Sequence, residues 1–134
     1  MVITLADYFF MRKQYYFRPF QNRFYAWDVD RLIKLTKDSE VKQISLDSIK
    51  EIDENHWFNN DETPTCRAIF EHAKLIQEAD LNYPIILAED GRVMDGMHRV
   101  GKALIQGQDI IDAVQFRADP EPDFRDVYPD ELQY

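Results

Sequence analysis

The chain of 134 residues is long enough for one domain with a real hydrophobic core. Its hydrophobic content of 45% and aromatic content of 13% are typical of a globular protein and exclude an intrinsically disordered one. The net charge of −9 argues against a protein that coats nucleic-acid phosphates, because such binding draws its affinity from clustered Lys and Arg. A single cysteine excludes an internal disulfide framework and favours a cytoplasmic location, and no apolar run approaches the roughly 20 residues of a membrane span.

Residues 1–26 are predicted to form an aromatic arm that is basic on an otherwise acidic chain. Its charged side chains are those of Arg12, Lys13, Arg18 and Arg23 against Asp7. Basic residues among aromatic ones could bind single-stranded nucleic acid by stacking and charge. Alternatively, the arm packs on its own domain or forms the contact of a homodimer, because ordinary burial uses the same residue types.

The next two elements are short. Residues 28–37 are predicted to form a helix that is capped by its first residue, with Val29, Leu32 and Ile33 facing inward. Residues 41–46 are predicted to form a strand, with Val41, Gln43 and Ser45 on one face and Lys42, Ile44 and Leu46 on the other; which face is inward stays open.

Residues 52–60 are polar, show no clean alternation and are predicted to form a loop. Loops on a rigid scaffold often carry function, and Glu54 or His56 could act as the general base of a reaction. Trp57 and Phe58 could stack on a flat ligand ring. Alternatively, these two aromatic side chains fill gaps in the core, and their polar neighbours face solvent.

A longer helix is predicted to begin at Thr63 and Pro64 and to run to about residue 80. The spacing of Ile69, Ala73 and Ile76 predicts the buried stripe of this helix.

The first turn of the same helix contains polar side chains. Thr65 and Arg67 could present a second anion-binding edge. The helix terminus and the neighbouring arginine would favour a thiolate at Cys66, although a lone cysteine is more often a small buried hydrophobe. His72, near the apolar stripe, is expected to be a partly buried structural histidine.

The clearest pattern follows. Residues 84–88 are a continuous apolar run, which predicts a strand covered on both faces. An Asp-Gly turn leads to a second strand at 92–94. A helix is then predicted from Asp95, as its N-cap, to Gln106.

The start of this helix is predicted to bind an anion. The first amides of a helix lack partners and carry partial positive charge, and Gly96 would let a ligand approach the amides that follow, including that of Met97. His98 and Arg99 would neutralise a phosphate. Asp95 could cap the helix or hold Mg²⁺. Alternatively, this is a well-capped helix with His98 and Arg99 in solvent.

Residues 81–104, LNYPIILAEDGRVMDGMHRVGKAL, resemble the core of the ParB/sulfiredoxin-like superfamily. ParB-type domains have a helix, a Pro-Ile strand, a hairpin and a Gly-x-x-Arg box that opens the next helix. Pro84-Ile85 and residues 96–99 stand in those positions. Sulfiredoxins have a Gly-x-His-Arg box, and the free serine kinases of the superfamily have an Asp-Gly-x-His-Arg box, which residues 95–99 match. The resemblance extends over about residues 41–116.

The resemblance implies a mixed α+β fold, with a small twisted sheet flanked by helices, over residues 27–117. It implies that a nucleoside di- or triphosphate with Mg²⁺ binds at the box, with nucleotide hydrolysis or phosphotransfer to a small molecule as the reaction. Glu54, His56 and His98 would then be the catalytic candidates. Sulfiredoxin chemistry is not expected, because Met97 stands where those enzymes have their cysteine.

A last strand is predicted at 110–116, and an acidic tail at 118–134 is expected to be solvated or to wrap the surface. Two other functions stay open. The chain could be a non-enzymatic protein-interaction module that acts through the arm, or a DNA-associated ParB-like protein. The net charge argues against the second, and so does the absence from the sequence of the helix-turn-helix domain that ParB proteins use to read DNA.

Overall fold

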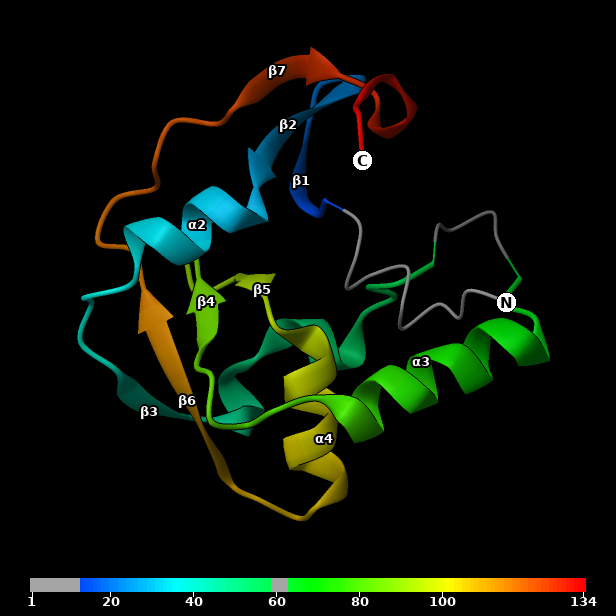
Figure 1. Ribbon diagram of the computed structural model, residues 1–134, viewed down its shortest axis with the longest axis vertical. Helices are drawn as coiled ribbons and strands as arrows, with labels where there is room; N and C mark the ends of the chain where they lie inside the picture. The colour runs from blue at the N-terminus through cyan, green and yellow to red at the C-terminus, as the bar shows by residue number, and fades with distance from the viewer. Residues whose placement is uncertain (1–12, 59–62) are drawn as a thin grey trace.

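The computed structural model describes residues 13–58 and 63–134. Within these ranges the chain forms two small sheets and three α-helices, with short 3-10 helices between them (Figure 1). The predicted mixed α+β class is confirmed.

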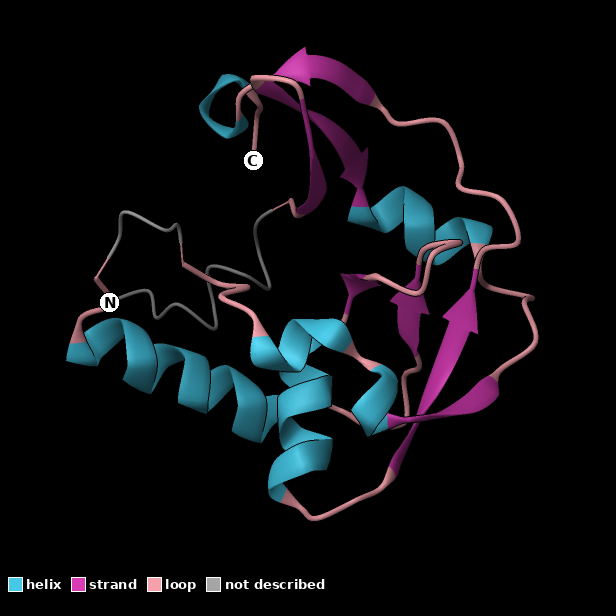
Figure 2. Cartoon of the chain, turned by 180° about the vertical axis from the view of Figure 1, so that it is seen from behind, coloured by secondary structure: helices cyan, strands magenta, loops and turns pink. Residues whose placement is uncertain are grey.

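A four-stranded sheet forms the centre of the molecule, in the order β3-β6-β4-β5 (Figure 2). The strands are β3 (Lys42–Ser45), β4 (Ile85–Leu87), β5 (Val93–Asp95) and β6 (Ile110–Gln115). β4 and β6 run parallel, whereas β3 on β6 and β5 on β4 are antiparallel. The predicted strands at 41–46, 84–88, 92–94 and 110–116 are therefore present.

Strand β4 is covered on both faces, as its continuous apolar run predicts. Ile85 and Leu87 belong to one hydrophobic core, and Ile86 and Ala88 belong to the other. All four side chains are at most 3% exposed. This follows from the two-residue period of a strand, which sends successive side chains to opposite faces.

The first core lies under helix α4 (Met97–Ile105), whose Val100 and Ala103 are fully buried. Helix α3 (Cys66–Glu78) packs against α4. Gly101 allows close packing here, because a Cβ atom at that position would lie 3.4 Å from the Ile76 side chain.

Two details of α3 differ from the prediction. The helix begins two residues later than expected, with Thr65 as the N-cap that accepts a hydrogen bond from the Ala68 amide (3.1 Å). Ile69 and Ala73 are exposed, so the predicted buried stripe is wrong at these positions. The half-buried residues are instead Ala68, Glu71, His72, Leu75, Ile76 and Ala79. The packing against α4 and against Trp57 selects this face, and the sequence spacing does not encode that choice.

The second sheet joins the two ends of the described chain. Its order is β1 (Tyr15–Phe20), β2 (Arg23–Asp28) and β7 (Phe124–Val127), with both pairings antiparallel. The described part of the predicted arm therefore packs on its own chain. Residues 1–12, and with them Asp7 and Arg12, lie outside the described residues, and a homodimer through the arm remains a prediction.

The acidic tail is paired with the basic arm. Arg18 forms an ion pair with Asp119 at 3.1 Å. Asp123 accepts a hydrogen bond from the Asp28 amide and forms an ion pair with Arg31, both at 2.8 Å. Much of the tail that was predicted to be solvated is thus the strand β7 and the segment that leads to it. Its carboxylates form ion pairs with arginines about 100 residues earlier in the chain.

Helix α2 (Val29–Leu35) links the two sheets. Asp28 caps it by accepting a hydrogen bond from the Asp30 amide at 3.0 Å, as predicted. Val29 and Leu32 are buried, and Leu32 packs in the second core beside Trp27. Ile33 is 50% exposed, so its predicted inward orientation is wrong.

Across the described part of the chain, we find no helix with the length and apolar character that crossing a bilayer requires.

Candidate functional site

The Asp95–Arg99 box occupies the turn from β5 into α4. Gly96, not Asp95, is the N-cap residue of α4, and its backbone is left-handed at φ = +115°. The predicted cap at Asp95 is therefore wrong. One Asp95 carboxylate oxygen instead accepts a hydrogen bond from the Arg99 guanidinium at 2.8 Å.

The packing around position 96 requires a glycine. A Cβ atom at this position would lie 2.6 Å from the Cγ2 atom of Ile85, closer than real side chains come. The same atom would lie 3.0 Å from a nitrogen of Arg99. The glycine therefore lets β5 turn into α4 directly over strand β4, and protein atoms fill the side of Gly96 on which a Cβ atom would stand.

Arg99 anchors the chain that precedes β4. One of its nitrogens donates to the carbonyl oxygens of Tyr83 (3.1 Å) and Pro84 (2.9 Å), while another donates to Asp95. Its side chain is only 16% exposed. A guanidinium that is held in this way has a fixed position, and the adjacent carboxylate offsets much of its charge toward an incoming anion.

His98 is part of a stack of three rings. Its Nε2 atom lies 2.9 Å from Nδ1 of His72, so one imidazole donates a hydrogen bond and the other accepts it. The Trp57 indole stacks on both imidazoles, with ring centres at 4.5 Å from His72 and 4.8 Å from His98. This stack fastens the loop after β3 onto α3 and α4.

The histidines of this region are neutral at pH 7. Burial, together with the neighbouring His72, His56 and Arg99, lowers the pKa of His98 to about 4. The pKa of His72 is lowered by burial, and that of His56 is lowered by its many neighbouring protein atoms although its surface is open to solvent. His98 therefore offers a polar contact at neutral pH, and the predicted neutralisation of a phosphate by His98 would need acid.

All five box residues line a cavity of about 950 Å³. Its walls come from α2, the C-terminal end of α3, the segment before β4 and the start of α4. The charged side chains on these walls are Asp30, Lys37, Glu78, Asp80, Asp95 and Arg99. The apolar ones include Val29, Ile33, Leu75, Pro84, Ile86, Met97 and Val114. The sequence did not predict the walls from α2 and α3, because these segments come close only in the folded chain.

The other predicted site residues lie away from this cavity. Glu54 accepts a hydrogen bond from Arg92 at 2.6 Å, which holds the pKa of Glu54 below its usual value. His56 sits beside Trp57, Thr65 caps α3, and Arg67 is exposed in the first turn of α3. None of the four lines the cavity.

Glu51 is a buried residue that no sequence pattern singles out. Its carboxylate is 6% exposed and accepts a hydrogen bond from the Val93 amide at 2.6 Å. Its other oxygen lies 3.8 Å from the Arg92 guanidinium. Glu51 thus ties the 3-10 helix Lys50–Asp53 to β5 and fixes the start of the loop that carries Trp57.

The described residues form no obvious metal centre. Outside 1–12 and 59–62, no group of three or more His, Cys, Asp or Glu side chains could hold a metal ion. One oxygen of Asp95 is paired with Arg99, and Mg²⁺ at Asp95 stays a prediction.

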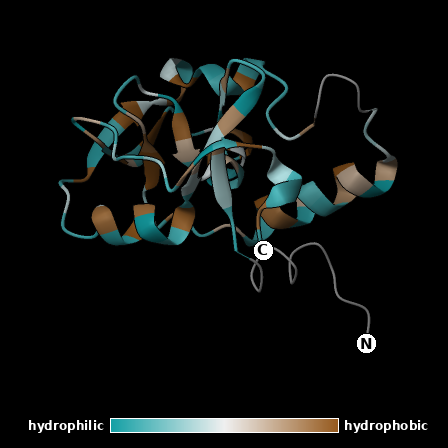
Figure 3. Cartoon of the chain, turned by 90° about the horizontal axis from the view of Figure 1, so that it is seen from above, coloured by the Kyte–Doolittle hydropathy of each residue, from teal (hydrophilic) through white to brown (hydrophobic). Residues whose placement is uncertain are grey.

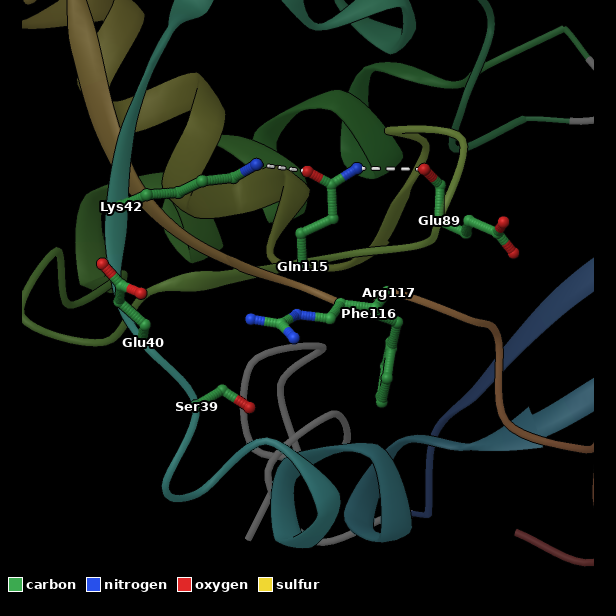
Figure 4. A pocket seen from close by; sticks show the side chains of 7 residues that line it. All are labelled: Ser39, Glu40, Lys42, Glu89, Gln115, Phe116 and Arg117. Carbon is green, nitrogen blue, oxygen red and sulfur yellow. Dashed lines mark hydrogen bonds between the residues drawn. The ribbon is translucent and has the colours of Figure 1, made fainter.

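A second hollow, of about 720 Å³, lies beyond the C-terminal ends of β4 and β6 (Figure 4). There Lys42 donates to the Gln115 side chain, which donates in turn to the carbonyl oxygen of Glu89 at 3.1 Å. The Arg117 side chain reaches into the hollow from the end of β6 (Figure 4). Apart from half-buried Gln115 and Phe116, the residues that line this hollow are exposed, so it is a shallow surface feature.

The resemblance to the ParB/sulfiredoxin-like superfamily rests on the motif alone and stays a prediction. Comparisons with protein-family models, with curated proteins and with solved structures found no match to this chain.

Proposed function

We propose that this chain binds a nucleotide in the cavity over the N-terminal end of α4. The single observation that carries the proposal is that Asp95, Gly96, Met97, His98 and Arg99 all line one cavity of about 950 Å³. Small-molecule sites are concave, largely apolar and of this size. The resemblance to the ParB/sulfiredoxin-like superfamily supports the same ligand class.

In this proposal the phosphates lie against the first amides of α4. These amides carry the positive end of the helix dipole, and α4 has nine residues. Lys37 supplies positive charge, with a smaller share from Arg99 because Asp95 is paired with it. The apolar wall that contains Ile33 and Pro84 supplies contact for the base.

The charge of the cavity favours a nucleotide that arrives with its own magnesium ion. Four carboxylates face the cavity, from Asp30, Glu78, Asp80 and Asp95, against the two cations Lys37 and Arg99. A bare triphosphate would be repelled by this excess of negative charge, whereas a magnesium complex carries less of it. Binding is the function that we propose. Hydrolysis or phosphotransfer would need a base. Of the three candidates, only His98 lines the cavity, and Glu54 and His56 do not.

A thermal-shift panel tests the proposal. It would compare ATP, ADP, CTP, GTP, pyrophosphate and free amino acids, each with Mg²⁺ and with EDTA. A ligand at about 100 times its Kd should stabilise the fold by about 2.7 kcal/mol, which is a shift of several degrees. Absence of a shift with every phosphate ligand would refute the proposal.

The matched variants are Ile33→Trp and Leu35→Trp. Both residues lie on α2 and are about half exposed, at 50% and 49%, but only Ile33 lines the cavity. Ile33→Trp should fill the cavity and abolish the shift, whereas Leu35→Trp should keep it. Arg99→Ala is the less informative variant, because it also removes the anchors on Tyr83 and Pro84.

A further inference from the structure

Helix α3 presents an apolar face that the rest of the described chain does not cover. Ile69 is 50% exposed and Phe70 is 69% exposed, and Cys66 and Ala73 are exposed beside them. The helix extends outward from the body of the molecule (Figure 1), and hydrophobic segments recur along it (Figure 3). Contiguous exposed apolar side chains mark interaction surfaces.

The two sides of this face differ. With 100° between successive residues, Arg67, Glu71, Lys74 and Glu78 all fall on one side. Ile69 and half-buried Ile76 fall on the other side. The signs on the charged side alternate along the helix, which is the pattern that a second helix of the same sequence can match.

We propose that α3 pairs with α3 of a second copy of this chain, antiparallel, about a two-fold axis that passes between His72 and Ala73. In an antiparallel pair the same sides of the two helices meet. Arg67 then faces the partner's Glu78, and Glu71 faces the partner's Lys74. Each contact occurs twice by symmetry. A parallel pair would instead set the charged side of one helix against the isoleucine side of the other.

The apolar residues of the exposed face also come into register about this two-fold axis. Ile69 comes level with the partner's Ile76 on the uncharged side. Phe70 comes level with the space between the partner's Ala73 and the partner's Gln77, where the small alanine leaves room for a ring. The opposite side of α3 is fixed to the rest of the protein, because Trp57 stacks on His72 and Gly101 packs on Ile76. One helix pair is smaller than a standard interface, so we expect a dissociation constant on the order of micromolar.

Sedimentation velocity at rising protein concentration tests the pairing. The native chain should pass from monomer to dimer. Phe70→Asp should raise the dissociation constant about a hundredfold or more, because it places two charges in the apolar centre. Ile105→Asp is the matched control, since Ile105 on α4 is 75% exposed and lies outside the face. Its dissociation constant should equal that of the native chain.

A charge swap tests the register. The fourfold variant inverts every charge on the charged side of α3 and keeps opposite charges four residues apart within the helix. Its substitutions are Arg67→Glu, Glu71→Lys, Lys74→Glu and Glu78→Arg. It should dimerise with itself about as well as the native chain, yet form mixed dimers with the native chain at least about tenfold more weakly. A native chain that stays monomeric would overturn the proposal and leave this face to a different partner. Equal effects of Phe70→Asp and Ile105→Asp, or free formation of mixed dimers, would overturn it as well.

Discussion

At the start of α4, Asp95, Gly96 and Arg99 serve the fold before they serve any ligand. Asp95 and Arg99 bind each other, Arg99 also holds the Tyr83 and Pro84 carbonyls, and Gly96 lies against Ile85. A partly buried guanidinium with three partners is costly to disturb, because removing it leaves a carboxylate and two carbonyl oxygens without their donors. The Asp95–Arg99 box is therefore held rigidly by contacts within the protein, and a binding site needs such a rigid scaffold.

Gly96→Ala should destabilise the protein by about 2–4 kcal/mol, because it combines backbone strain at φ = +115° with a collision at Ile85. Gly91→Ala is the matched control. Gly91 also has a positive φ, of +89°, but a Cβ atom there would meet nothing within 4 Å, so we expect a loss of about 1 kcal/mol. Urea unfolding measures both losses. Equal losses would show that strain alone, without the contact to Ile85, accounts for Gly96.

The depressed pKa of His98 predicts how stability depends on pH. The unfolded chain binds a proton at His98 near pH 6.5, but the folded chain binds it only near pH 4. The stability that depends on a neutral His98 is thus fully present above pH 6.5 and is lost as the pH falls toward 4, by about 2–3 kcal/mol. His98→Gln should flatten the curve of unfolding free energy against pH in this window. Curves of equal slope for the native chain and the variant would contradict the assignment.

At the element scale, the sequence predicts what local signals encode. The apolar run of β4, the Asp-Gly turn and the capped start of α2 were each predictable, because the responsible residues are neighbours in the chain. The exposed face of α3 and the buried Glu51 were not. The side of a helix that becomes buried depends on which element packs against it, and an acidic residue is normally expected at the surface. The box itself was predictable, but the cavity over it needs α2 and α3 brought together by the fold.

The stability of strand β7 also depends on contacts between residues that are far apart in the sequence. Asp123→Ala should destabilise the protein by about 1–2 kcal/mol, because it removes the acceptor for the Asp28 amide and the partner of Arg31. It should also lower the hydrogen-exchange protection of residues 124–127. Asp130→Ala, in the 3-10 helix Pro129–Glu131, is the control and should be nearly neutral. Unchanged exchange in Asp123→Ala would mean that the pairing with β2 alone holds the strand.

On the scale of the whole molecule, Trp27 makes the two sheets interdependent. Trp27 lies in β2 of the three-stranded sheet, yet its side chain is 2% exposed and packs in the core of the four-stranded sheet with Ile86 and Met94. Its ring nitrogen donates a hydrogen bond at 2.8 Å to the carbonyl oxygen of Pro120, which lies in the segment between β6 and β7. The arm, the centre and the tail, which the sequence separates into three segments, are therefore connected through this indole.

Deletion of residues 118–134 should then lower the stability of the entire molecule, beyond the loss of the strand itself. The indole would lose its acceptor and part of its cover, and Arg18 and Arg31 would lose their carboxylate partners. We expect the native chain to unfold in a single transition, with the near-ultraviolet signal of the aromatic arm and the far-ultraviolet signal of the helices changing together. The deletion variant should also unfold in one transition, at a clearly lower temperature. Two separate transitions in the native chain would show that the aromatic sheet unfolds independently, and the tail would then stabilise only that sheet.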